Sequence, residues 1–397
     1  MEDTAGVLLD LFVIFVLAKL AAELFERLRQ PAVVGELLVG VAIGPYALGI
    51  VDVPFAGSGD SLTFVYDVIA ELGLVMLLFS VGLGTRLDEL LEVGPRALAV
   101  AVLGGALSFA LGAGLMAALG DGSTESLFVG AALLATSVGI SARVFRDLGV
   151  LGSREARIIL GAAVVDDILA LLALTAVAQT GESGGVDARE VGVTAVLAVA
   201  FVAFATLIGT RAVRQYSLHL ERLRFSDAPL AFALALMLGL SAAAAELGLA
   251  GIIGAFLAGL MLAESREHLQ LEERVAPIAA FLVPFFFVLT GAKVDLGLFA
   301  EGETLALALA ITGLAIAGKL IGCGAAGLGL GGRPMAILGV GMMPRGEIGF
   351  VVASVGLAQG SIGGDVFSAV VFMSVATTLL TPPLLAALFR GRTPVAT

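Results

Sequence analysis

The chain has 397 residues, of which 59% are apolar and 14% are charged, and its mean hydropathy is +1.06. Soluble domains carry about 25% charged residues, so this composition excludes a soluble fold and predicts an all-α polytopic membrane protein. The single Cys323 excludes a disulfide framework and a thiolate metal site, and the two histidines, His219 and His268, lie far apart. No cofactor is expected, and a net charge of −12 gives no reason to expect a nucleic-acid partner.

Thirteen apolar spans follow one another along the chain, with several short loops of turn residues between them. The division of residues 229–265 into two spans depends on Glu246 and Gly248 as the turn. The thirteen spans cover approximately residues 7–23, 33–50, 64–84, 97–119, 126–148, 158–180, 191–211, 228–246, 249–265, 276–292, 304–330, 335–358 and 365–389.

Loop charges support this count and predict an orientation. Sixteen of the 22 basic residues fall in loops after odd-numbered spans, whereas the loops on the other side hold only Arg189 and Lys293. The positive-inside rule then places the N-terminus outside and the C-terminus in the cytoplasm of a cell (inner) membrane. Residues 1–6 are acidic where a cleaved signal peptide needs a basic segment, so no cleaved signal is expected.

The fifth span is predicted to be broken. Its sequence LLATSVGISARVF (133–145) places Thr136, Ser137 and Gly139 at the centre. Arg143 is close enough to the cytoplasmic end for its side chain to extend to the membrane surface, as is Lys19 in the first span. A kink satisfied by neighbouring helices is the alternative to a functional break.

The sixth span (158–180) carries two adjacent carboxylates, Asp166 and Asp167. At about 1.5 Å per residue, they lie roughly 12–14 Å into a hydrocarbon core about 30 Å thick. A carboxylate at that depth is costly and marks a functional site with a partner. One such residue could instead face a water-filled crevice without any role, but two in succession favour function.

Lys319 lies about half-way along the eleventh span (304–330), at a depth like that of the two aspartates. A buried ammonium needs a partner, and a carboxylate at the same depth is the obvious one. Residues near the ends of spans can reach water, but Lys319 cannot. A pair between Lys319 and one of the two aspartates is therefore predicted.

The twelfth span is also predicted to be broken, within GVGMMPRGEIGF (339–350). Pro344 removes a helix hydrogen bond, and the glycines around it loosen the backbone. Arg345 and Glu347 have the charges needed to balance the opposed ends of two half-helices. The triplets of spans 4–6 and 11–13 thus share a broken middle helix and, being seven spans apart, cross the membrane in opposite senses, as an inverted-repeat transporter requires.

Four segments in fixed order resemble the monovalent cation:proton antiporter family, specifically the NapA-type bacterial sodium/proton antiporters. The segments are ATSVGISARVF (135–145), GAAVVDDILALL (161–172), AGKLIG (317–322) and GVGMMPRGEIGFVVA (339–353). The match is collinear from about residue 10 to 390. It implies the NhaA/NapA-like fold, in which two broken helices cross near the membrane midplane.

The resemblance also implies a homodimer in which each chain has a scaffold, a mobile core and a linker. Residues 1–93 and 228–300 would form a dimerisation scaffold, residues 94–185 and 301–392 a mobile core that transports ions, and residues 186–227 a linker helix. Carried onto this sequence, the family pattern makes Asp167 the ligand of the transported sodium and Asp166 the partner of Lys319. Thr136 and Ser137 would line the ion path.

Helical geometry separates the roles of the two aspartates, because adjacent residues point about 100° apart. The expected function is sodium/proton antiport, with lithium as a possible second substrate and with Asp167 alternating between proton and sodium. A proton exchanged by Asp166 and Lys319 would make two protons per sodium and an electrogenic cycle. The core would move past the scaffold in an elevator-like way.

Two other functions can be weighed on the sequence. A potassium/proton antiporter or Kef-like potassium efflux protein would share the fold, but relatives of that kind often carry Gln-Asp at the pair and a nucleotide-binding domain after the last span. An intramembrane aspartyl protease also uses two buried carboxylates, and the chain contains a G-x-G-D string at 57–60. Adjacent aspartates on one helix cannot form the facing dyad of such a protease, so an enzyme is not expected.

Overall fold

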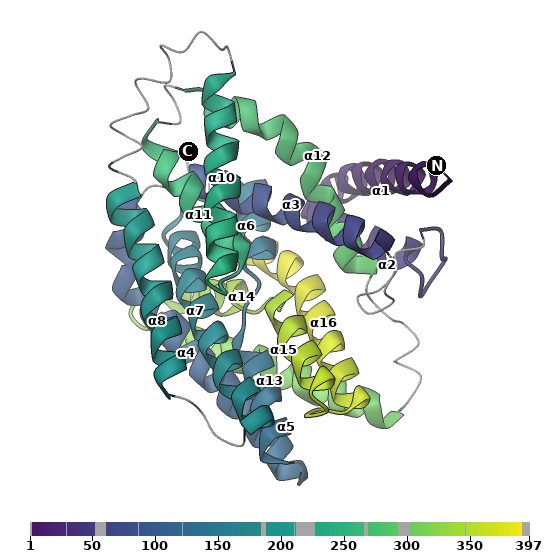
Figure 1. Ribbon diagram of the computed structural model, residues 1–397, viewed down its shortest axis with the longest axis vertical. Helices are drawn as coiled ribbons and strands as arrows, with labels where there is room; N and C mark the ends of the chain where they lie inside the picture. The colour runs from purple at the N-terminus through teal and green to yellow at the C-terminus, as the bar shows by residue number, and fades with distance from the viewer. Residues whose placement is uncertain are drawn as a thin grey trace.

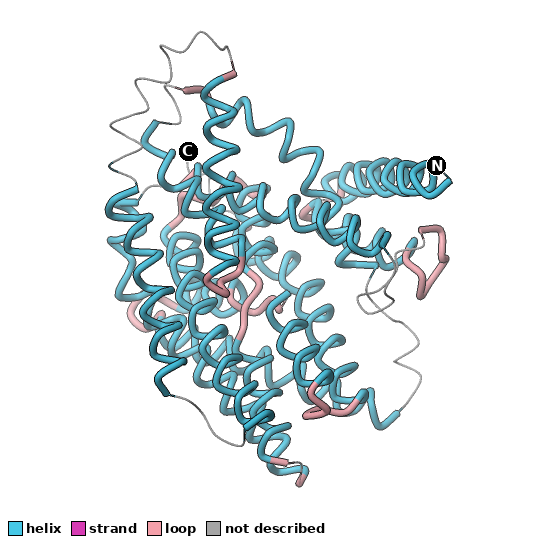
Figure 2. Tube along the Cα trace, viewed as in Figure 1, coloured by secondary structure: helices cyan, strands magenta, loops and turns pink. Residues whose placement is uncertain are grey.

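The computed structural model is built of helices and connecting loops throughout its described part (Figure 2). That part comprises residues 2–28, 30–51, 61–85, 87–120, 122–183, 188–209, 211, 227–265, 269–292, 302–345 and 347–390. Of the residues named above, His219, His268, Lys293 and the string 57–60 lie outside it, as does the side chain of Glu347.

The helices follow the predicted apolar spans closely (Figure 1). Their bounds are α1 Glu2–Arg27, α2 Ala32–Ile43, α3 Ser61–Leu83, α4 Leu87–Leu119, α5 Ser123–Leu134, α6 Val138–Asp147, α7 Arg154–Ser183, α8 Ala188–Ala203, α10 Ala228–Glu246, α11 Gly251–Leu262, α12 Leu271–Ala292, α13 Gly302–Ala326, α14 Gly332–Gly341, α15 Glu347–Ala358 and α16 Gly364–Phe389. A π-helical turn, η1 (Phe204–Gly209), continues α8, and a 3-10 turn, η2 (Ala263–Ser265), continues α11.

Within the described residues, ten helices are long and apolar enough to cross a membrane, counting α5 and α6 as one. The chain is therefore a multi-pass membrane protein. The other three predicted spans correspond to the short apolar helices α2 and α11 and to the interrupted pair α14 and α15. The exact count of thirteen spans and the inverted repeat remain predictions.

The helices pack into two groups. In the first, called here the α3 group, α1, α2, α3, α10, α11 and α12 lie against one another. In the second, the α4 group, α4, α5, α7, α13, α14, α15 and α16 do so, and α6 belongs with them by its contacts with α7 and α16. Contacts of α6 with α2 and α3 join the groups, and α8 with η1 touches α7 on one side and α11 on the other. The predicted scaffold, core and linker segments, with their roles, remain predictions.

Glycines allow α4 and α13 to approach closely. A Cβ added at Gly104 would lie 2.2 Å from Cys323 Sγ, and one at Gly318 would lie 2.7 Å from Ser108 Oγ. A Cβ at Gly322 would lie 2.6 Å from Leu103 O. Small residues are the usual means by which membrane helices pack, because lipid provides little hydrophobic drive between them. This close contact positions Lys319, which lies between Gly318 and Gly322 on α13.

Gly104→Ala is expected to destabilise the protein by about 1–3 kcal/mol, because the new methyl group overlaps Cys323 Sγ in a packed interface. The measurement is the midpoint of heat-induced loss of the monodisperse peak in size-exclusion chromatography in detergent. Gly114→Ala on the same helix is the control, since nothing lies within 4 Å of its added Cβ. The double variant Gly104→Ala/Cys323→Ala should recover part of the loss. Equal midpoints for Gly104→Ala and Gly114→Ala would contradict the packing argument.

Candidate functional site

Two helix interruptions meet inside the α4 group. The first separates α5, which ends at Leu134, from α6, which begins at Val138. The second separates α14, which ends at Gly341, from α15, which begins at Glu347. The backbone N–H of Ser137 donates to Pro344 O at 2.8 Å, so the two interruptions touch directly. Residues about 200 positions apart in sequence are thereby held at one place.

The free carbonyl groups at the end of α14 are satisfied from α6 and the segment before it. Ser141 Oγ donates to Gly341 O at 2.6 Å, and Thr136 Oγ1 donates to Met342 O at 3.3 Å. The last carbonyls of a helix have no partner within it, and an unpaired one in a membrane interior is costly. The hydroxyl groups of Ser141 in α6 and of Thr136 before it therefore stabilise an interruption in a different helix.

Arg345 occupies the centre of the crossing, with 1% of its surface exposed. Its Nη1 donates to Ala135 O at 2.6 Å and to Thr136 Oγ1 at 3.3 Å. Its Nη2 donates to Ser108 Oγ and to Ala315 O, both at 3.4 Å. Ala135 is the C-cap of α5, so the guanidinium lies at the negative end of that helix dipole. Arg345 thus binds groups from α4, the α5 end and α13 at once.

The backbone of Arg345 is held by α16. Its N–H donates to Thr377 Oγ1 at 3.1 Å, and its carbonyl accepts from Thr378 Oγ1 at 2.9 Å. Both threonines are buried. Pro344 and its neighbours have left the helical hydrogen-bond pattern, and these hydroxyl groups replace the missing partners.

Asp166 and Lys319 form a buried ion pair. Lys319 Nζ donates to Asp166 Oδ1 at 3.1 Å and to Oδ2 at 3.3 Å, and neither side chain has exposed surface. Two charges withdrawn from water are tolerated only with good geometry and mutual compensation. The structure therefore brings Lys319 together with Asp166, the aspartate that the family resemblance implied as its partner.

Asp167 points to a different place. It lines a small cavity with about 10 Å³ of free space, close to what one water molecule needs. From the α4 group, Val138 of α6 and Ala163 of α7 also line this cavity, and from the α3 group Leu78 of α3 and Phe256 of α11 do so. Asp167 is 5% exposed. The two adjacent carboxylates thus face separate surroundings, one inside the α4 group and one at the boundary between the groups.

Thr136 and Ser137 lie at the interruption, as predicted, and their described contacts are with the α14–α15 segment. The α6 residue that lines the cavity beside Asp167 is Val138, which follows Ser137 in sequence. Their part in an ion path remains a prediction. Glu347 is the first residue of α15, a position where the helix dipole stabilises a carboxylate. Its side chain lies outside the described residues.

A second ion pair, between a partly buried arginine and a fully buried glutamate, crosses the boundary between the groups. Arg143 Nη2 of α6 lies 3.4 Å from Glu36 Oε1 of α2, while Arg143 Nε donates to both oxygens of Asp147 at 2.9 Å. Glu36 is fully buried, and its Oε2 has no hydrogen-bond partner. The Arg143 guanidinium also lies 5.8 Å from the Phe287 ring centre of α12. Arg143 is 11% exposed and is held by both Glu36 and Asp147, and the sequence interpretation that its side chain extends to the membrane surface remains a prediction.

Several residues of the site were not singled out from the sequence. Ser108, Thr377 and Thr378 are small polar residues within apolar spans, a pattern common at interfaces between membrane helices. Glu36 offered a clearer signal, since a carboxylate in the apolar run AVVGELLVGVAI needs a partner. The identity of each partner depends on contacts between distant segments, which the local pattern does not contain.

Comparison with known proteins identifies similar chains over almost the whole length. Residues 12–391 match the family model described as sodium/hydrogen exchanger, transmembrane. The chain is 38% identical to the high-affinity Na+/H+ antiporter NhaS3 of Synechocystis sp., covering 98% of this chain and 90% of that protein. It is 37% identical to the Na+/H+-K+ antiporter GerN of Bacillus cereus, covering 92% of each.

A solved structure has the same fold. The sodium proton antiporter MjNhaP1 from Methanocaldococcus jannaschii matches with a TM-score of 0.67 over 98% of this chain and 97% of that chain. The sequence identity in this comparison is 18%, so it bears on the fold alone.

Proposed function

Because the chain belongs to the sodium/hydrogen exchanger family of transmembrane transporters, we propose that it exchanges sodium for protons across a cell membrane. The observation that carries this proposal is the arrangement of the two adjacent aspartates. Asp166 is engaged by Lys319 inside the α4 group, while Asp167 lines a cavity at the boundary between the helix groups. A carboxylate there can take either a proton or a cation, and both would compete for it.

Asp167 is the proposed carrier of sodium. A dehydrated sodium ion is a hard cation that needs oxygen ligands, and the site offers the carboxylate of Asp167. The hydroxyl and carbonyl oxygens of Thr136 and Ser137 lie one or two residues from Val138, which lines the same cavity. When a proton replaces sodium, the carboxylate becomes neutral and the occupied site stays close to the same net charge. This exchange accounts for obligatory coupling without any chemical reaction.

The ion pair of Asp166 and Lys319 is the proposed source of the second proton. In the proton-loaded state, Asp167 is protonated and Lys319 is an ammonium paired with Asp166. In the sodium-loaded state, Lys319 has released its proton and both carboxylates are charged beside the ion. The sodium-loaded site then carries one positive charge fewer than the proton-loaded site, as two protons per sodium require.

Transport would proceed by movement of the α4 group against the α3 group. The Asp167 cavity lies between the groups, and the crossed interruptions with Arg345 lie wholly within one of them. A rigid displacement would expose Asp167 first to one side and then to the other, which is alternating access of the elevator kind. We further propose that residues 1–93 and 228–300 form the scaffold of a homodimer.

The two-proton cycle predicts that exchange responds to the membrane potential. One net charge moves per cycle, so 100 mV contributes about 2.3 kcal/mol, or about a 50-fold change in the sodium ratio at equilibrium. Proteoliposomes with a potential set by potassium and valinomycin should therefore shift the sodium gradient at which net flux stops. Vesicles with equal potassium on both sides are the control. An unchanged reversal gradient would refute the second proton and leave sodium/proton exchange standing.

Cation choice is tested in the same vesicles. Sodium appears in the names of both similar antiporters, and GerN is also named for potassium. Proton efflux monitored by a pH-sensitive dye after pulses of sodium, lithium or potassium should give the strongest response to sodium. The proposal fails if only potassium produces a response.

A further inference from the structure

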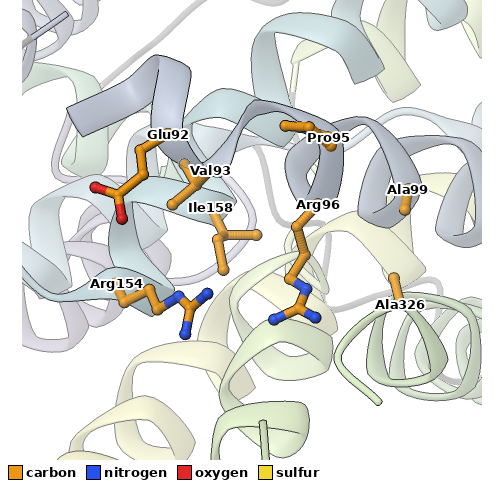
Figure 3. Close-up of a pocket in the computed structure, with 8 residues that line it drawn as sticks. All are labelled: Glu92, Val93, Pro95, Arg96, Ala99, Arg154, Ile158 and Ala326. Atoms are coloured by element: carbon orange, nitrogen blue, oxygen red, sulfur yellow. The ribbon is translucent and has the colours of Figure 1, made fainter. Parts of the chain in front are cut away.

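A cavity of about 360 Å³ lies where α4, α7 and the end of α13 meet. From α4, Glu92, Pro95 and Arg96 line it; from α7, Arg154 and Ile158; and from α13, Ala326 (Figure 3). Glu92, Pro95 and Arg154 are exposed, so the cavity opens to the surface. Its volume is within the range of small-molecule sites. Arg96 and Arg154 lie at the helix ends that the charge pattern predicts to be cytoplasmic.

Two guanidinium groups are directed into this one space. Figure 3 shows the side chains of Arg96 and Arg154 extending from different helices towards the same side of the cavity. In the part of the chain that the structure describes, neither has a hydrogen-bond or ion-pair partner. Each guanidinium carries five N–H donors in a planar fork that fits two oxygens of a phosphate. Their convergence supplies donors for an anion that neither helix provides alone.

Helix stability does not explain Arg154. It is the first residue of α7, and a cation at a helix N-terminus opposes the helix dipole. Glu155, in the same turn of α7, and Glu92, which lines the cavity, offset part of this positive charge, and a bound anion would offset more of it.

The charge and lining of the cavity indicate which anion fits. With Glu92 included, the titratable lining residues carry a net charge of +1, which suits a singly charged phosphodiester better than a doubly charged phosphate monoester. Ile158, Val93 and Ala326 provide an apolar wall beside the arginines. A phosphodiester attached to an apolar body would use both parts of the site.

We propose that this cavity binds a phosphate group held jointly by Arg96 and Arg154, with the phosphodiester headgroup of a membrane lipid as its ligand. Bound there, the headgroup joins α4, α7 and α13. Along α7, Ile158 is eight residues from Asp166, about 12 Å at 1.5 Å per residue. The proposed site is thus separate from the buried ion pair, although it contacts the same helices.

Ligand-dependent thermal stability tests this proposal independently of transport. Detergent-solubilised, delipidated protein is heated with increasing phosphatidylglycerol, phosphatidylethanolamine, diacylglycerol or inorganic phosphate. Phosphatidylglycerol should raise the unfolding midpoint of the wild-type protein. Each of Arg96→Gln and Arg154→Gln should raise the half-maximal lipid concentration about tenfold, since each variant loses the charge-assisted hydrogen bonds of one guanidinium group. Glu92→Gln should lower the half-maximal lipid concentration, because it removes a negative charge from the cavity.

The control variant is Arg27→Gln/Arg211→Gln, which removes two exposed arginines elsewhere on the surface. It should respond to lipid like the wild type. A midpoint raised by inorganic phosphate but not by lipid would overturn the lipid assignment and point to a soluble phosphate compound. Equal lipid responses in the wild type and in Arg96→Gln/Arg154→Gln, or an equal effect of diacylglycerol, would overturn the site itself.

Discussion

Asp167→Asn is expected to reduce sodium-dependent proton exchange to the level of empty vesicles. Asparagine keeps the shape of the side chain, but it neither binds a proton in the accessible pH range nor neutralises a cation. Asp167 is only 5% exposed and lines a cavity with room for about one water molecule. In the variant, bulk water therefore cannot stabilise the cation in place of the lost carboxylate charge. The measurement is dye-monitored proton efflux after a sodium pulse in proteoliposomes.

Asp365→Asn provides the matched control, because Asp365 is an exposed carboxylate in the first turn of α16. It should exchange like the wild type. Both variants should give the wild-type size-exclusion profile, which separates a lost ligand from a lost fold. Substantial residual exchange by Asp167→Asn, with sodium still competing against protons, would assign the carrier to another group.

The second large effect is expected at the buried ion pair. Lys319→Met should destabilise the protein by about 3–5 kcal/mol, because it leaves the Asp166 carboxylate buried without its cation. Asp166→Asn/Lys319→Met should recover most of that loss, since an uncharged pair of similar volume carries no desolvation cost. The midpoint of heat-induced loss of the monodisperse peak measures both effects.

The same double variant separates stability from coupling. It retains Asp167 and is expected to exchange one proton for each sodium, so an imposed potential should no longer shift its reversal gradient. The cycle of single and double variants gives the interaction energy of the pair. Equal stability of Lys319→Met and the wild type would show that Asp166 does not depend on Lys319.

Much of the fold follows from the sequence because bilayers impose a simple rule on it. The crossing segments of a helical membrane protein must be largely apolar, so most spans could be predicted from runs of apolar residues. The family resemblance drawn from four motifs is confirmed by the match over residues 12–391. The ion pair of Asp166 and Lys319 was predictable for a related reason. Charges at the same depth in a membrane have few possible partners, which left Asp166 and Asp167 as candidates, and the family resemblance selected Asp166.

The contacts of Arg345 were beyond prediction. Its charge beside Pro344 suggested balance between half-helix ends, and the bond to Ala135 O at the end of α5 supports that role. Its bonds to Ser108 and Ala315 depend on how α4 and α13 pack against the crossing. Helical periodicity determines the face on which a residue lies, but it does not determine which distant helix lies opposite that face.

The ion pair of Glu36 and Arg143 has a consequence for the speed of the proposed cycle. It links α2 of one helix group to α6 of the other, so displacement of the groups must separate it. Glu36 is fully buried and one of its oxygens is already unpaired, hence the separated carboxylate would need water or a new donor before the movement could finish. Part of the activation barrier would then be electrostatic. Buried charges are screened little by salt, so this part of the barrier should change little with ionic strength.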